Sequence, residues 1–123
     1  MKNLAFNDTG FLKYGDNFIE LQLFDLSNLV LDMKIDDEIC LNSHCFAKSE
    51  FNKRFLNTLY PKNFLKNVLK QKPIFNGEGY IKNKNGFLQI IKRKNIYIKY
   101  IISSDKLYFK DFSNHILIKL KRI

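Results

Sequence analysis

The sequence lacks any apolar run that approaches the roughly 20 residues of a membrane-spanning helix, so no such helix is predicted. Its first ten residues, MKNLAFNDTG, lack the apolar core of a signal peptide. The chain is therefore expected either to work in the cytoplasm or to begin after a removed signal or anchor. Tryptophan is absent, but 12 Phe and 6 Tyr among 123 residues exclude a disordered tail and favour strands.

Histidine and cysteine are scarce, with two of each. His44 and His115 lie outside any known nucleophile motif, and only His44 is close to the cysteines. Neither a catalytic centre nor a metal site is predicted, so we expect no enzyme and no cofactor. If the LNSH segment is a hairpin loop, the flanking Cys40 and Cys45 face each other and can form a disulfide. A disulfide indicates an oxidising compartment, and two free thiols are the alternative.

Acidic residues are scarce in the C-terminal part of the chain. Residues 1–79 hold ten basic and ten acidic residues, whereas residues 80–123 hold eleven basic residues against Asp105 and Asp111. The formal charge of +9 therefore belongs to the second segment. A basic surface attracts nucleic acid or anionic lipid. A composition rich in Lys, Asn, Ile and Phe also supplies lysine to ordinary solvated faces, and this interpretation stays open.

Apolar and polar residues alternate along much of the chain. The alternation in residues 18–24 and 29–35 predicts two half-buried strands joined by a turn at residues 25–28. Alternation returns from residue 80 onward, where Asn85-Gly86 is the strongest hairpin signal. Because lysines occupy the polar positions there, this part is predicted to be an antiparallel meander with one apolar and one basic face.

The middle of the chain has helical spacing instead. Residues 47–60 predict one helix with Ser49 as its N-cap, and residues 61–72 predict a second with Pro61 in its first turn. Neither helix can bury its apolar stripe alone, so both must cover the apolar face of the sheet. The sequence therefore predicts one α+β domain spanning residues 1–123, in which a curved antiparallel sheet carries two helices inside its curve.

This order of elements resembles LolB, the outer-membrane lipoprotein receptor, and more distantly LolA, its periplasmic carrier. In that family a Pro-Leu-Gly-type turn joins two strands, and Leu26 takes its leucine position, with Asp25 and Ser27 in place of the other two residues. A segment of the form P-x-x-x-L-x-x-W-L-x-G-x-P follows a helix. Its positions correspond here to Pro61, Leu65, Val68, Leu69, Gln71 and Pro73, where Val68 replaces the tryptophan and Gln71 the glycine.

The resemblance implies a half-closed β-barrel, with the two helices as a lid over an apolar cavity for lipoprotein acyl chains. The protein would be a monomer in the periplasm or on the periplasmic side of the bacterial outer membrane. It would meet a LolA-like carrier and an anionic membrane surface, and Leu26 would contact the membrane. The lipid-bearing N-terminal cysteine of the family is absent, so the roles of carrier and receptor both stay open. The candidate cavity lining is Ile19, Leu21, Leu31, Met33, Phe64, Leu65, Val68, Ile98, Tyr100, Leu107, Phe109, Ile116 and Ile118.

Two other interpretations stay open. For each candidate lining residue, plain core packing is the alternative to lipid contact. The second is a cytosolic nucleic-acid-binding β-domain, because residues 82–87 and 92–100 interleave cations with Phe87, Tyr97 and Tyr100. Isoleucine accompanies most of these lysines where a base-stacking face would show aromatic rings, so nucleic acid is the less favoured partner.

Overall fold

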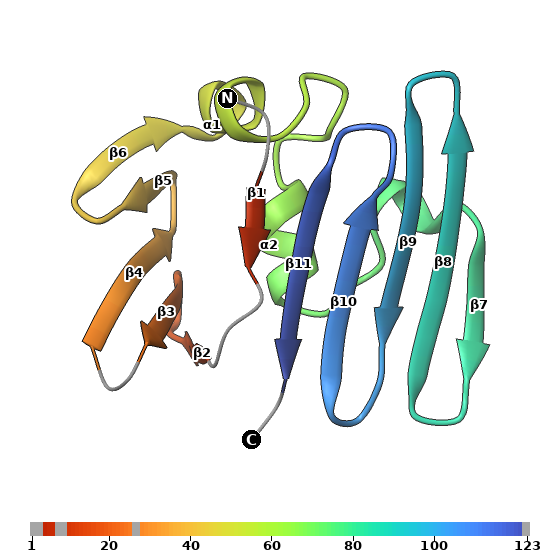
Figure 1. Cartoon of the computed structure of the whole chain (residues 1–123), viewed down its shortest axis with the longest axis horizontal. Helices are drawn as coiled ribbons and strands as arrows, with labels where there is room; N and C mark the ends of the chain where they lie inside the picture. The colour runs from red at the N-terminus through yellow and green to blue at the C-terminus, as the bar shows by residue number, and fades with distance from the viewer. Residues whose placement is uncertain (1–3, 7–9, 26–27, 122–123) are drawn as a thin grey trace.

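The computed structural model describes residues 4–6, 10–25 and 28–121. Its strands form two sheets, one of six strands and one of five. Two short helices follow the five-stranded sheet in the chain and lead into the last five strands of the six-stranded sheet, as Figure 1 shows. The predicted α+β class, the antiparallel strands and the two helices between strands are confirmed.

The larger sheet has six strands in the order β1-β11-β10-β9-β8-β7. All neighbouring strands in it are antiparallel except β1 and β11, which run parallel. Its strands are β1 (Leu4–Phe6), β7 (Tyr80–Asn83), β8 (Gly86–Arg93), β9 (Ile96–Ile102), β10 (Lys106–Asp111) and β11 (Ile116–Lys121).

The smaller sheet is a five-stranded antiparallel meander in the order β2-β3-β4-β5-β6. The predicted strand pair forms its centre, with a register shift between Leu23 and Phe24. Its strands are β2 (Gly10–Tyr14), β3 (Ile19–Asp25), β4 (Asn28–Ile35), β5 (Glu38–Leu41) and β6 (His44–Ala47).

The division into two sheets differs from the single curved sheet that the sequence predicted. The chain changes sheet twice: β1 pairs with β11 whereas β2 pairs with β3, and the helices separate β6 from β7, with which it does not pair in the described residues. Consecutive strands therefore occupy the edges of different sheets. The strands of the described residues form no closed or curled barrel.

Both helices are shorter than predicted. Helix α1 (Lys48–Phe55) starts after Ala47, not with Ser49 as its N-cap, and α2 (Phe64–Leu69) starts after Pro61. A turn closed by the Tyr60 amide and the Asn57 carbonyl oxygen separates them. A short 3-10 helix, η1 (Phe75–Gly77), then leads into β7. In Figure 1, α2 lies against one face of the six-stranded sheet, behind β11 and β10.

A single apolar core joins the sheets and the helices. It contains buried residues of β3, β4, α1, α2 and β8–β11. In β9, Ile96, Ile98, Tyr100 and Ile102 are buried. The alternate residues of this strand, Tyr97, Lys99 and Ile101, face outward. The predicted apolar face of the meander is thus confirmed on β9, whereas the outward face of this strand is mixed, with Lys99 between Tyr97 and Ile101. Burial of each large side chain contributes about 1.5–3 kcal/mol.

Candidate functional site

The thirteen residues predicted to line a lipid cavity meet in this core. They come from β3, β4, α2, β9, β10 and β11, and twelve of them are at most 2% exposed. Leu31 is half-buried and packs against the same cluster. A ring contact connects α2 to the six-stranded sheet, with 5.0 Å between the Phe64 and Phe109 centroids, and the Phe109 ring lies 6.1 Å from the Tyr100 ring on the neighbouring strand. These side chains form one apolar unit whose members touch one another.

Two tyrosine hydroxyls, one from each sheet, hold the C-terminal end of α2. The Tyr14 hydroxyl on β2 donates to the Leu69 carbonyl oxygen at 2.7 Å. The Tyr100 hydroxyl on β9 lies 2.9 Å from the Lys72 carbonyl oxygen and 3.3 Å from that of Val68. Burial raises the pKa of Tyr100, so the hydroxyl keeps its proton for this bond. Helix α2 therefore bridges the two sheets.

A buried carboxylate, Asp111, fixes the segment between the helices to the end of β10. Its Oδ2 accepts hydrogen bonds from the Tyr60 hydroxyl at 2.5 Å and from the Asn114 amide at 2.7 Å. Its Oδ1 accepts from the backbone amides of Tyr97 at 3.2 Å and Ser113 at 3.0 Å. Burial, followed by the hydrogen bond to Asp111, raises the pKa of Tyr60. This cluster was not predicted from the sequence.

A second buried polar residue, Gln89 on β8, holds the segment before β7. Its amide group pairs with the backbone N–H and carbonyl of Ile74 at 2.8 and 2.9 Å and also donates to the Glu78 carbonyl oxygen at 2.8 Å. Gln89 is fully buried, and these bonds satisfy both ends of its amide. The role of Gln89 was also not predicted from the sequence.

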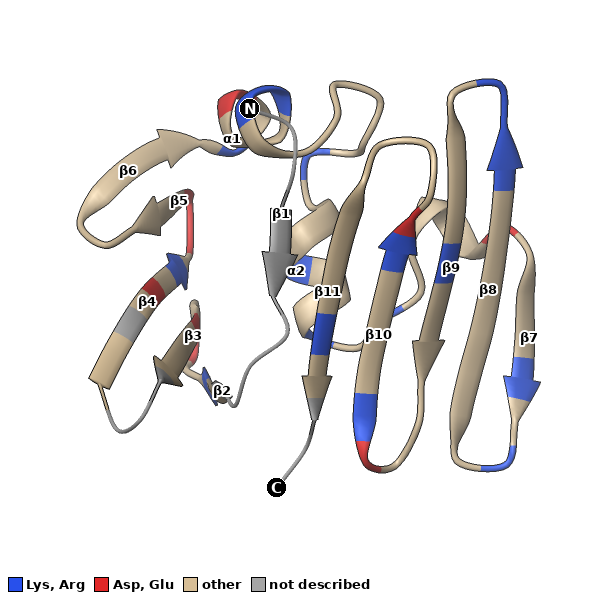
Figure 2. Cartoon of the chain, viewed as in Figure 1, with Lys and Arg blue, Asp and Glu red and all other residues tan. Residues whose placement is uncertain are grey.

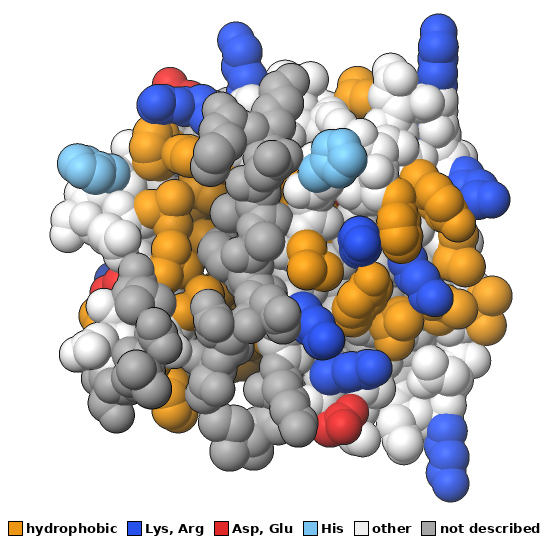
Figure 3. Space-filling view, in the orientation of Figure 1, with side chains coloured by type: hydrophobic (Ala, Val, Ile, Leu, Met, Phe, Trp, Pro, Cys, Tyr) orange, Lys and Arg blue, Asp and Glu red, His pale blue; other side chains and the backbone are white. Residues whose placement is uncertain are grey.

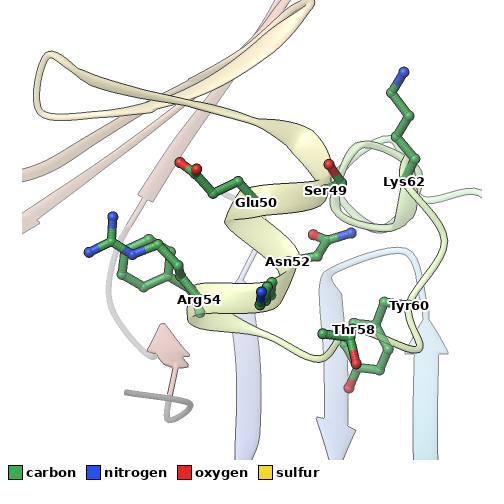
Figure 4. Close-up of a pocket in the computed structure, with 9 residues that line it drawn as sticks. Ser49, Glu50, Asn52, Arg54, Thr58, Tyr60 and Lys62 are labelled. Carbon is green, nitrogen blue, oxygen red and sulfur yellow. The ribbon is translucent and has the colours of Figure 1, made fainter.

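An open hollow of about 1040 Å³ lies between α1 and the segment that follows it. Figure 4 shows Asn52 pointing from α1 toward this space, with Tyr60 and Lys62 on the opposite side. The Asn52 amide nitrogen donates to the Pro61 carbonyl oxygen at 3.0 Å, whereas its buried Oδ1 has no hydrogen-bond partner among the residues that the structure describes. None of the thirteen candidate lining residues borders this hollow.

The outer face of the six-stranded sheet combines lysines with aromatic rings. Figure 2 shows basic residues on each of β8–β11, and Figure 3 shows basic and hydrophobic side chains interleaved over this side of the molecule. Lys99 and Lys110 are direct partners across β9 and β10. We name this surface the lysine face and define it by Lys92, Lys99, Lys110, Lys119, Tyr97 and Phe112.

The aromatic rings of the lysine face stack on each other and on lysines. The Tyr97 and Phe112 rings lie 5.1 Å apart, tilted by 36°. The Lys92 ammonium lies 4.9 Å from the Tyr97 ring centre, and the Lys110 ammonium lies 4.7 Å from that of Phe112. Each ring therefore contacts both the other ring and a cation.

The two cysteines form a disulfide, the first of the two alternatives left by the sequence. Cys40 and Cys45 are direct partners across β5 and β6 and are bonded to each other. The hairpin turn consists of Asn42 and Ser43 alone, both with positive φ angles, as the tightest hairpin turns require. The disulfide closes the end of this hairpin.

Leu26, the predicted membrane contact, lies outside the described residues. The described residues near its turn include an exposed apolar group. The Phe11 and Phe24 rings pack edge to face at 5.5 Å, and Leu29 is the cross-strand partner of Phe24. Phe11 is 50% exposed and Leu29 is 49% exposed.

Within residues 4–6, 10–25 and 28–121, no helix has the length and apolar character needed to cross a membrane, and no group of His, Cys, Asp and Glu is arranged to hold a metal ion. Comparison of the chain with protein families, curated proteins and solved structures found no match.

Proposed function

We propose that this protein binds the acyl chains of lipoproteins between its two sheets. It would serve lipoprotein transfer or insertion at the bacterial outer membrane, as a carrier or receptor similar to LolA and LolB. One observation carries the proposal: α2 lies between two sheets that share no hydrogen-bonded strand pair in the described part of the chain. In this view the sheets are the two halves of a half-closed barrel, and the helices cover its apolar face.

Helix α2 is suited to act as a movable cover. It has six residues, and a helix of that length is not stable by itself, so its position depends on burial. Besides apolar contacts, hydrogen bonds from the Tyr14 and Tyr100 hydroxyls hold its C-terminal end. An acyl chain can replace the apolar contacts, because each buried CH₂ group contributes about 0.8 kcal/mol.

Two further features support a place in the bacterial envelope. A disulfide such as Cys40–Cys45 persists in oxidising compartments, which include the periplasm. The exposed Phe11 and Leu29 lie near the turn that carries Leu26, and together they offer an apolar tip to a membrane. Leu26→Glu is accordingly expected to impair delivery of a lipoprotein to membranes.

Uptake of a fluorescent fatty acid and of an acylated peptide tests the proposal. The wild-type protein is expected to bind both probes. Tyr100→Phe removes the hydroxyl that holds the end of α2, so probe uptake should become several-fold faster if α2 is the cover. Tyr97→Phe is the matched control, because Tyr97 lies on the outer face, and its uptake rate should equal that of the wild type. Absence of probe binding by both the wild type and Tyr100→Phe would contradict the proposal.

A further inference from the structure

The lysine face contains a like-charge cross-strand pair that folding alone does not explain. Lys99 and Lys110 are directly opposed on neighbouring strands, and like charges in that position destabilise a sheet. Lys119 lies on the same side, opposite Tyr108 on β10. Along β8–β11, the outward positions that the structure describes include no Asp or Glu to offset these charges. A surface that keeps uncompensated cations together has the charge complementary to an anionic partner.

The apolar side chains of the lysine face favour one of two anionic partners, a lipid bilayer, over the other, nucleic acid. Nucleic acid bases bind by stacking on free aromatic faces. On this surface Tyr97 already contacts Phe112 and Lys92, which approach it from the strands on either side, and Phe112 contacts Tyr97 and Lys110. The remaining apolar residues include aliphatic ones such as Ile90, which is 41% exposed. Lysines mixed with aromatic and aliphatic side chains suit the head-group region of a bilayer.

We propose that the lysine face docks on an anionic phospholipid surface. The ammonium groups of Lys92, Lys99, Lys110 and Lys119 contact the phosphates, and the Tyr97–Phe112 pair lies at the level of the head groups. Charge and ring contacts on the outside of the sheet support this docking, which is independent of acyl-chain binding in the core.

The sharpest variant is Lys99→Glu. It replaces two opposed cations by an opposed ion pair, which is expected to raise or preserve the melting temperature. The same change weakens attraction to anionic lipid, and we expect a loss of vesicle affinity of roughly tenfold or more. Lys53→Glu on the exposed side of α1 makes the same change in net charge away from the lysine face and is the control.

The experiment measures co-sedimentation of the full chain with vesicles at two salt concentrations. Vesicles containing phosphatidylglycerol should bind the wild type and Lys53→Glu alike and release both as salt increases, whereas pure phosphatidylcholine should bind neither. Equal binding to both vesicles, or equal affinity of Lys99→Glu and Lys53→Glu, would overturn the proposal. So would tighter binding of a single-stranded oligonucleotide than of the anionic vesicles at the same salt concentration.

Discussion

Asp111 shows how one residue fixes a connection between elements. Four donors from the inter-helix segment, β9 and the β10–β11 turn converge on its two oxygens. Asn57 extends the cluster, because its amide donates to the Asn114 side-chain oxygen at 2.7 Å and its own oxygen accepts from the Leu59 backbone. A carboxylate can satisfy four donors because both of its oxygens only accept.

Asp111→Asn tests this arrangement. Whichever way the new amide turns, its NH₂ group faces donors where an acceptor is needed, so the free energy of unfolding should fall by about 1–3 kcal/mol. Urea denaturation measures the loss. Asp105→Asn is the control, because Asp105 is exposed and accepts a hydrogen bond from the Ser103 hydroxyl, and its effect should stay within about 0.5 kcal/mol. Equal losses in the two variants would contradict a special role for Asp111.

The sequence carried a signal for both missed polar residues. Asp111 follows Leu107 and Phe109 at the inward positions of β10, and Gln89 stands between Phe87 and Ile91 at those of β8. Alternation alone therefore places a carboxylate and an amide inside the core. Their partners could not be predicted, because they come from segments that only tertiary folding brings close, such as Tyr60 and Ile74.

At the scale of elements, the β7–β8 hairpin lies where the sequence predicted it, but Gly86 has a different role from the one predicted. Asn85-Gly86 marked the hairpin, but the turn residues are Lys84 and Asn85, since Asn83 pairs with Gly86. Gly86 does not have a positive φ angle. A Cβ atom there would lie 1.9 Å from the Ile102 carbonyl oxygen, so the glycine permits close approach of β9.

Gly86→Ala is therefore expected to displace the backbone of two strands and to cost about 3 kcal/mol of stability. Gly77→Ala provides the comparison. Gly77 has a φ angle of +81° but no atom within 4 Å of a new Cβ, so backbone strain alone should cost about 1 kcal/mol. Thermal and urea denaturation of both variants measure the difference. If Gly86→Ala costs no more stability than Gly77→Ala, then crowding of a Cβ atom against β9 does not determine the effect at Gly86.

The helices illustrate why element boundaries were harder to predict than element types. Apolar spacing continued to Tyr60, but the Leu56 amide makes the last α1 bond, to Asn52, and side-chain bonds of Asn57 then direct the chain into a turn. Tyr60 keeps its inward position by joining the Asp111 cluster instead of a helix. Tertiary hydrogen bonds thus overrode local helical preference.

At the scale of the whole molecule, the two sheets share one apolar cluster that includes α2. They are therefore expected to unfold together. Leu65→Ala, in the buried side of α2, should reduce the opening free energy of β3 and β9 amides equally, by about 2–5 kcal/mol. Hydrogen exchange measures both strands in one experiment, and Leu59→Ala, at a side chain 55% exposed, should change neither. Unchanged protection of β3 in Leu65→Ala would show that the sheets are independent.

The division into two sheets could not be predicted from local patterns. Alternation identifies a strand and its buried face, but it does not specify which distant strand becomes the neighbour. Here neighbouring strands in the sequence belong to different sheets at two places, between β1 and β2 and between β6 and β7. The residues expected to share a core could be found because inward positions are a local property, whereas their arrangement on two sheets is not.

The pairing of Leu4 with Ile116 also has a consequence for biosynthesis. A ribosome makes β1 before its hydrogen-bonding partner β11, and strands β2–β10 are made in between. The five-stranded meander, whose neighbours are close in sequence, can form while synthesis continues. Until β11 arrives, β1 is a strand with an open edge, the state most exposed to aggregation and most in need of a chaperone.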